Sequence, residues 1–294
     1  MPGLVLRLAA AALALAWAAG PSAVYAQDSK PLKVRFYSAD ADRTLIGGIY
    51  HKPLRSGKRP GKRPGVVMLH GCAGLYTRTG KLRPRPRFWS RWLLDKGYAV
   101  LMADSFTPRG HGSICSVAAR PLRADTERPF DAYGALRFLQ AQPEIIADRI
   151  ALMGWSNGAM TLFWALKRTA PQRPRDLVHD FRAAVAFYPG CNRLKKGPYG
   201  TSVPILLQLG LADDWTPARH CLDLVARTRG QAMPLKVDTY ENAYHGFDNP
   251  SSAVRTVLTR NGNSERRVHV GTNLAARNAA VVRVEGFLAG HLTP

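Results

Sequence analysis

The sequence predicts an α/β fold with a mostly parallel central sheet of about eight strands, covered by helices on both faces. Short, continuous apolar runs alternate with segments whose apolar residues recur at helical spacing. Such runs are typical of strands that are buried on both faces, as they are in a parallel sheet between helices. At the start of the chain, two segments rich in β-favouring residues, 32–38 and 44–51, predict an antiparallel hairpin that enters the sheet.

The remaining elements follow from the same patterns, taken in order along the chain. Buried strands are expected at 65–70, 98–104, 150–153, 183–187, 204–209 and 235–240. Helices are expected at 88–96, 130–142, 159–166, 219–229 and 273–291. The first of these helices ends at Gly97, a residue favoured at helix C-termini. The loop 105–124 is long enough to suggest a functional loop, and 249–271 is polar and is expected to be irregular.

Residues 1–26 have the pattern of a secretory signal peptide. Arg7 precedes an apolar run, 8–19, and cleavage is expected after Ala26. The run is short for a membrane span and is followed by Gly20 and Pro21, so an uncleaved anchor is the less favoured alternative, and no later stretch approaches that length. We therefore expect a secreted or periplasmic protein without a transmembrane segment, whose remaining residues, 27–294, form one domain.

The chain is strongly basic, with 42 Lys and Arg against 20 Asp and Glu, a net charge of +22. Such a charge can mean binding to nucleic acid, to a membrane surface or to acidic ligands. Here much of it lies in segments such as 58–63 and 78–87, mixed with Pro and Gly rather than with aromatic residues. We interpret it as a solvated basic surface and do not expect nucleic acid as a partner.

Four cysteines remain after residue 26, and an oxidising compartment would favour their pairing. Three connectivities are possible. Cys191 follows a predicted strand and Cys221 lies in the helix after the next strand, so a Cys191–Cys221 bond would join neighbouring loops at one edge of the sheet. That pairing leaves Cys72 with Cys115. No ligand spacing typical of a metal site is present, so we expect neither a metal ion nor another cofactor.

The strongest functional signal is 154–158, which reads Gly-Trp-Ser-Asn-Gly. It stands between a predicted strand and a predicted helix, the context of the nucleophile elbow. The turn is so tight that residues beside the nucleophile must be nearly free of side chain, which accounts for both glycines. Ser156 is thus the predicted nucleophile, although a capping serine at an ordinary strand-to-helix turn is the alternative.

A serine hydroxyl needs a neighbouring base, and that base works best when a carboxylate fixes its tautomer. His245 follows the last predicted strand, at the carboxyl edge of the sheet, and is our choice of base. Asp213 follows the strand 204–209 at the same edge, with Asp214 as a rival for the carboxylate. The order Ser156, Asp213, His245 is that of a hydrolase with an elbow of this kind. The other histidines considered are His51, His70, His111, His179, His220, His269 and His291.

The reaction would also need two donors for the oxyanion of the tetrahedral intermediate. The backbone N–H of Asn157 follows the nucleophile directly. The second is expected from the glycine-containing loop 70–74, and we assign the backbone N–H of Cys72. The Cys72 thiol is not expected to be the nucleophile, since no histidine is better placed to activate it than to activate Ser156.

The chain resembles the dienelactone hydrolase family of α/β-hydrolases over residues 60–292. The resemblance rests on the loop 70–75, the strand leading to Asp104, the elbow, Gly210-x-x-Asp213 with Pro217, and 245–247. It implies the α/β-hydrolase fold and favours Asp213 over Asp214. Family members with acidic lactone substrates bind the carboxylate through arginines, which implies a substrate-binding role for Arg109, although its offset in the loop does not match cleanly and a solvated arginine is the alternative.

Two departures shape the functional prediction. The namesake enzymes carry cysteine where Ser156 stands here, and they are cytosolic, whereas this chain carries an export signal. The sequence therefore predicts a serine hydrolase that cleaves a carboxylic ester or lactone through an acyl-enzyme. A peptidase or acyltransferase on the same scaffold and a non-catalytic basic protein that binds anionic polymers are the alternatives. The natural substrate and the oligomeric state stay open.

Overall fold

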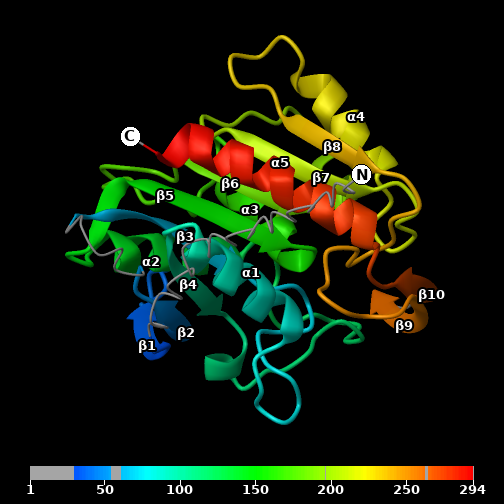
Figure 1. Cartoon of the computed structure of the whole chain (residues 1–294), viewed down its shortest axis with the longest axis horizontal. Helices are drawn as coiled ribbons and strands as arrows, with labels where there is room; N and C mark the ends of the chain where they lie inside the picture. The colour runs from blue at the N-terminus through cyan, green and yellow to red at the C-terminus, as the bar shows by residue number, and fades with distance from the viewer. Residues whose placement is uncertain (1–29, 54–60, 196, 262–263, 294) are drawn as a thin grey trace, which may run out of the picture.

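The structure is a computed structural model, and it describes residues 30–53, 61–195, 197–261 and 264–293. A twisted sheet of eight strands forms its centre, with helices on either side (Figure 1). The spatial order of the strands is β1-β2-β4-β3-β5-β6-β7-β8. Their bounds are Leu32–Tyr37, Leu45–His51, Arg63–Leu69, Ala99–Asp104, Ile145–Trp155, Ala183–Phe187, Ile205–Gly210 and Lys236–Tyr240 for β1 to β8.

The sheet is antiparallel at one edge and parallel elsewhere. Strand β1 pairs antiparallel with β2, and β2 pairs antiparallel with β4. All remaining neighbours, from β4 through β3 and β5 to β8, run parallel. Every residue of β4, β6 and β7 is buried, as the continuous apolar runs predict. The predicted fold class, including the entering hairpin, is confirmed.

Helices cover both faces of the sheet and form two apolar cores with it. On one face lie α2 (Glu127–Gln140), α3 (Asn157–Ala165) and α4 (Arg219–Thr228), and on the other α1 (Pro84–Asp95) and α5 (Leu274–Leu292). Successive residues of a strand point to opposite faces. Consequently Val67 and Leu69 of β3 join the first core, while Val66 and Met68 join the second.

One segment differs from its prediction. The range 249–271, expected to be irregular, contains the antiparallel hairpin β9 (Arg255–Asn261) and β10 (Ser264–Val270), a two-stranded sheet separate from the main one (Figure 1). Charged residues interrupt the β-favouring Thr and Val residues of this range, so the sequence does not show a clear strand pattern. The Asn261-Gly262 dipeptide, a strong hairpin signal, could have revealed it. Strand β5 is also longer than predicted, beginning at Ile145 rather than at 150.

No helix in the described part of the chain is long and apolar enough to cross a membrane. The predicted signal peptide, 1–26, lies outside the described residues, as do residues 54–60, which include the first part of the basic segment 58–63. Cleavage after Ala26 and a single domain over 27–294 therefore stay predictions.

Candidate active site

The turn between β5 and α3 holds Ser156 in an unusual backbone conformation. Its φ is 51° and its ψ −113°, a region that residues with a side chain rarely occupy and that costs energy to maintain. The glycines on either side make it possible. A Cβ on Gly154 would lie 2.6 Å from the Gly158 carbonyl oxygen, and a Cβ on Gly158 would lie 2.2 Å from that of Leu69. The sequence motif thus corresponds to a strained turn packed tightly against β3.

His245 and Asp213 meet in a buried pair at the carboxyl edge of the sheet. Asp213 follows β7 and His245 follows β8, and His245 Nδ1 lies 2.8 Å from Asp213 Oδ2. The backbone N–H groups of Trp215 and Thr216 donate to Asp213 Oδ1 at 2.9 and 2.8 Å, and the Thr216 hydroxyl donates to Oδ2 at 2.9 Å. These donors hold the carboxylate so that it can fix the imidazole tautomer with a proton on Nδ1.

Asp214, the rival carboxylate, is engaged elsewhere. Its Oδ2 lies 2.8 Å from His269 Nδ1, and its Oδ1 accepts from the His269 backbone N–H at 2.9 Å. Asp214 therefore anchors strand β10 and does not contact His245.

Ser156 and His245 line the same cavity, which has a volume of about 380 Å³. Among the described residues, no hydrogen bond joins the Ser156 hydroxyl to His245. Such bonds are often long in a free enzyme and tighten once substrate binds. The His245 ring lies between two aromatic rings, with centroids 4.6 Å from that of Tyr188 and 4.7 Å from that of Trp215. Tyr188 and Trp215 thus fix the position of the imidazole, and His245 lines the cavity that Ser156 also lines.

The two predicted oxyanion donors flank Ser156. Asn157 is the first residue of α3, so its backbone N–H has no partner within the helix. The loop after β3 packs against the elbow: a Cβ on Gly71 would lie 3.3 Å from the Trp155 carbonyl oxygen and 3.6 Å from Ser156 Cβ. The next residue, Cys72, lines the cavity beside Ser156. This arrangement can present two N–H groups to an oxygen on a carbonyl carbon attacked by Ser156.

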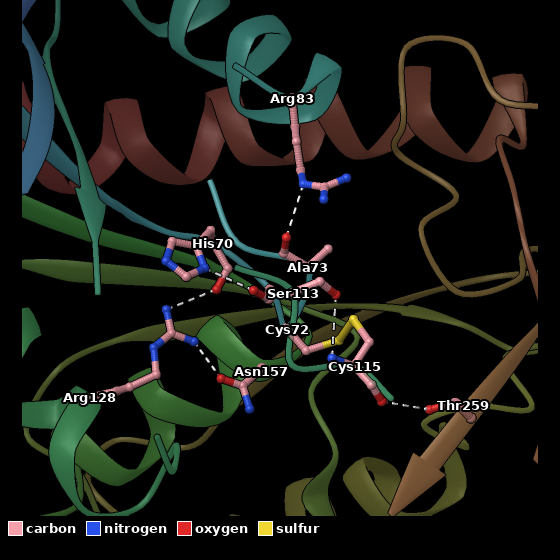
Figure 2. The surroundings of a disulfide bond; sticks show 10 residues. His70, Cys72, Ala73, Arg83, Ser113, Cys115, Arg128, Asn157 and Thr259 are labelled. Atoms are coloured by element: carbon pink, nitrogen blue, oxygen red, sulfur yellow. Dashed lines mark hydrogen bonds between the residues drawn. A yellow bond between two sulfur atoms is a disulfide. The ribbon is translucent and has the colours of Figure 1, made fainter. Parts of the chain in front are cut away.

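The structure contains the disulfides Cys72–Cys115 and Cys191–Cys221, with Cα–Cα distances of 4.9 and 5.1 Å. The first links the loop 70–74 to the loop 105–124. The Cys72 carbonyl also accepts from the Ile114 backbone N–H at 2.8 Å, and the Cys115 carbonyl accepts from the hydroxyl of Thr259 on β9 at 3.3 Å (Figure 2). Three segments distant in sequence therefore meet at this disulfide, beside the cavity.

His70, directly before this loop, is a buried neutral histidine. Its Nδ1–H donates to the Gly71 carbonyl at 2.8 Å, and Nε2 accepts from the Ser105 backbone N–H at 3.3 Å. Burial, and then the charge of Arg128, lower the pKa of His70 well below its ordinary value. Asp104 Oδ1 lies 3.9 Å from Nε2, but with the ring neutral this contact is not an ion pair. His70 thus fixes the shape of the loop and is not a second base.

Arg109, for which the resemblance implies a substrate-binding role, lies away from the cavity that Ser156 and His245 line. Arg109 does not line the cavity; its guanidinium donates two hydrogen bonds to buried Asp131, at 2.9 and 2.8 Å, and one to the Ser105 carbonyl at 2.8 Å. Asp131 is fully buried, and an ionised carboxylate is stable there only with a cation beside it. In this structure, Arg109 is the cation that pairs with Asp131.

Three other arginines line the cavity. Arg83 directly precedes α1, Arg85 lies in the first turn of α1, and Arg255 is the first residue of β9. Among the described residues that line the cavity there is no Asp or Glu. The Arg83 Nε donates to the Ala73 carbonyl at 3.1 Å, which directs this side chain over the loop (Figure 2). Sequence reasoning missed these arginines, because nothing local distinguishes them from solvated ones.

A buried carboxylate, Asp248, lies behind the site and was also missed. The indole N–H groups of Trp89 and Trp155 donate to its Oδ2 at 2.8 and 2.7 Å, and the Tyr188 hydroxyl donates to Oδ1. Arg85 Nε lies 3.2 Å from Oδ1. Burial works to lower the pKa of Arg85, but Tyr188 and Asp248 together keep it above its ordinary value. Asp248 thus fixes Tyr188, which supports His245, and Arg85, which lines the cavity.

Within the described ranges, no group of three His, Cys, Asp or Glu side chains could hold a metal ion. The residues that converge on the cavity are instead an exposed hydroxyl, an imidazole paired with a carboxylate, and backbone N–H groups. This set can carry out nucleophilic attack on a carbonyl carbon with proton transfer by the imidazole.

Comparison with known proteins gives a family match. The family described as the dienelactone hydrolase family matches residues 53–291 of the chain. A search of curated proteins finds no match.

Solved structures share the fold at low sequence identity. A dienelactone hydrolase-like promiscuous phosphotriesterase from metagenomic libraries is 21% identical with a TM-score of 0.61, covering 89% of this chain and 98% of its own. A thermophilic esterase of Thermogutta terrifontis, solved with propionate bound, is 15% identical with a TM-score of 0.58, covering 88% and 95%. A puromycin hydrolase is 17% identical with a TM-score of 0.62, covering 88% of this chain and 39% of its own.

Proposed function

The chain belongs to the dienelactone hydrolase family, and from this premise we propose that it is an exported serine hydrolase that cleaves a carboxylic ester or lactone. One observation carries the proposal: His245, which pairs with Asp213 at 2.8 Å, lines the same cavity as a serine held in the strained turn between β5 and α3. Within the family, a nucleophile at this turn with a carboxylate-oriented base is the arrangement for acyl transfer.

In the proposed reaction, Ser156 Oγ attacks the carbonyl carbon while His245 Nε2 takes its proton. Asp213 holds the proton on Nδ1 and stabilises the imidazolium. The backbone N–H groups of Cys72 and Asn157 donate to the oxyanion. As the intermediate collapses, the bond to the leaving oxygen breaks and that oxygen takes the proton from His245, leaving the acyl group on Ser156. Water then attacks the acyl carbon, His245 takes its proton and returns it to Ser156, and the free acid leaves.

The charge around the cavity supports an ester or lactone that carries a negative group. Among the described residues, neither Arg83 nor Arg255 forms an ion pair, and no acidic side chain lines the cavity. Burial, and then the nearby charge of Arg85, lower the pKa of Arg83. An anion bound here would relieve this crowding of positive charge. We therefore propose a substrate with a carboxylate beside the scissile bond.

Labelling with a fluorophosphonate probe tests the mechanism. We expect the parent protein to be labelled, and Ser156→Ala and His245→Ala not to be, with ester turnover lost in parallel. Substantial esterase activity in folded Ser156→Ala would refute the assignment. A folded parent without labelling or turnover would favour the alternative of a non-catalytic basic protein, which salt-dependent retention on DNA would then examine.

A pair of substrates tests the substrate class. Mono-p-nitrophenyl succinate and p-nitrophenyl butyrate have acyl chains of the same length, but only the succinate carries a carboxylate. We expect a higher kcat/KM for the succinate in the parent and loss of this preference in an Arg83→Met, Arg255→Met double variant. Arg137→Met, an exposed arginine of α2 paired with Asp176, serves as the control and should keep it. Equal kcat/KM for both esters in the parent would refute an anionic substrate.

Export is proposed on separate grounds. The pattern of residues 1–26 is that of a signal peptide, and two disulfides are typical of proteins in oxidising compartments. An intact mass of the exported protein that corresponds to residues 27–294 with four oxidised cysteines would support the proposal. Retention of residues 1–26, or two free thiols, would contradict it.

A further inference from the structure

Arg128, near the start of α2, is a fully buried arginine directly behind the proposed oxyanion hole. Its side chain has no exposed surface. One terminal nitrogen donates to the His70 backbone carbonyl at 2.9 Å, and the other donates to Oδ1 of the Asn157 side chain (Figure 2). Its guanidinium carbon lies 5.0 Å from the centroid of the Phe106 ring. The proposed mechanism gives this residue no role.

Arg128 has no anionic partner in direct contact. The carboxylates of Asp131 and Asp104 act on Arg128 only through space, and Asp131 gives both of its oxygens to Arg109. Among the described residues, Arg128 takes part in no ion pair, and its Nε has no hydrogen-bond partner. Burial lowers the pKa of Arg128 to about 10, so the guanidinium still carries its charge at neutral pH. A buried cation held only by neutral acceptors is unfavourable for folding, which calls for an explanation.

The two acceptors belong to the two segments that supply the proposed oxyanion donors. His70 stands two residues before Cys72, and Asn157 itself carries the other donor N–H. Because the guanidinium is planar and rigid, bonds from its two terminal nitrogens fix the distance between their acceptors. Arg128 therefore fixes the distance between the loop after β3 and the first turn of α3. Ser156 lies next to both segments.

We propose that Arg128 is a positioning residue for the oxyanion hole, and that its unpaired charge stabilises the negative oxygen of the tetrahedral intermediate. The ester carbonyl of the substrate is neutral and gains little from this cation. The oxyanion forms in a site with little water, where a fixed positive charge acts strongly. Burial of Arg128 destabilises the folded protein, but the buried charge lowers the free energy of the transition state that leads to the tetrahedral intermediate. This inference rests on the proposed serine hydrolase function.

Two variants separate this role from a purely structural one. Arg128→Met removes both the charge and the bonds, with a side chain of similar length. Asn157→Asp keeps the backbone N–H and an oxygen that can accept from Arg128, but it neutralises the guanidinium. A carboxylate in the first turn of α3 and a new ion pair should preserve or raise stability. The charge role therefore predicts a loss of activity for Asn157→Asp without a loss of stability, and parental activity in this variant would exclude that role.

Turnover of p-nitrophenyl butyrate and inhibition by phenylboronic acid are the readouts, since the boronate becomes tetrahedral and anionic on Ser156 Oγ. We expect kcat to fall roughly tenfold to a hundredfold in both variants with KM nearly unchanged, below the loss for a direct oxyanion donor. The inhibition constant for phenylboronic acid should rise by a similar factor. Arg137→Met, on the same helix but exposed, is the control and should match the parent.

The outcomes distinguish this inference from the proposed function. A parent without turnover, indistinguishable from Ser156→Ala, would overturn both. An active parent with an unchanged kcat in folded Arg128→Met, or with a loss confined to KM, would overturn the role of Arg128 alone. If Arg128→Met does not fold, Asn157→Asp decides: parental kcat and parental boronate affinity in that variant would overturn the inference.

Discussion

Replacing Asp248 by Asn tests whether the buried carboxylate behind the site holds this region together. The change keeps the shape of the side chain but removes its charge. If the amide oxygen takes the place of Oδ2, the indole N–H groups of Trp89 and Trp155 keep their acceptor. The amide nitrogen then replaces Oδ1, which accepts from Tyr188 and pairs with Arg85. The variant thus loses two charged contacts and leaves Arg85 without a counter-charge.

The magnitude follows from these two contacts. A hydrogen bond to a charged group contributes about 1.5–3 kcal/mol, and removing one partner of a buried ion pair costs about 3–5 kcal/mol. We expect Asp248→Asn to lower the free energy of unfolding by about 3–5 kcal/mol. Because Tyr188 packs against the His245 ring at 4.6 Å, we also expect a lower kcat in the folded variant.

Urea denaturation followed by circular dichroism measures the stability, and tryptophan fluorescence, to which Trp89 and Trp155 contribute, gives a second signal of unfolding. Asp95→Asn is the matched control, because Asp95 is half exposed and pairs with Arg91 one helical turn away. An exposed pair of this kind contributes no more than about 0.5 kcal/mol. Stability of Asp248→Asn within about 1 kcal/mol of the parent would refute the reasoning, since single-site changes outside buried networks commonly fall in that range.

Three further changes test the elbow, the pH dependence of stability and a disulfide. Gly158→Ala places a Cβ 2.2 Å from a backbone carbonyl oxygen, so we expect a loss of at least about 3 kcal/mol or no soluble protein; Gly290→Ala, where a Cβ meets nothing within 4 Å, is the control, and equal urea midpoints would contradict the strained packing. His70 has a folded-state pKa well below 6.5, so the unfolded chain binds a proton that the folded state refuses, and stability should fall as pH drops below about 6.5. The stability difference between the parent and His70→Gln should therefore shrink from pH 7.5 to pH 5, and a constant difference would show that His70 does not contribute. Replacing Cys72 and Cys115 together by Ser opens a bond between residues 43 apart in sequence, which the loop-entropy relation values at about 4 kcal/mol; urea unfolding that matches the oxidised parent would rule this out.

The elbow and the strands were readable from the sequence because their causes are local. A turn with Gly on both sides of a Ser allows a backbone that other residues forbid, and continuous apolar runs can be satisfied only between two covered faces. The loop after β3 was placed for the same reason, since its glycines follow a buried strand directly. In these cases, neighbours along the chain supply the physical constraint.

Local sequence patterns do not show which charged side chains pair with one another. Arg109 and Arg83 both lie in basic or glycine-containing loops, and only the fold shows that Asp131 binds Arg109 while Arg83 faces the cavity. The hairpin of β9 and β10 was missed because its alternation is masked by arginines, although it supplies Arg255 to the cavity.

By itself, the sequence determined the α/β fold, the strained serine turn and the order of Ser156, Asp213 and His245. The tertiary structure alone decided which arginines line the cavity, and that Asp248 and Arg128 lie buried behind it. The physical reason is distance along the chain. Trp89 and Asp248 are 159 residues apart and Arg128 and His70 are 58 apart, so whether such a charge is buried, and what satisfies it, depends on contacts that exist only once the chain has folded.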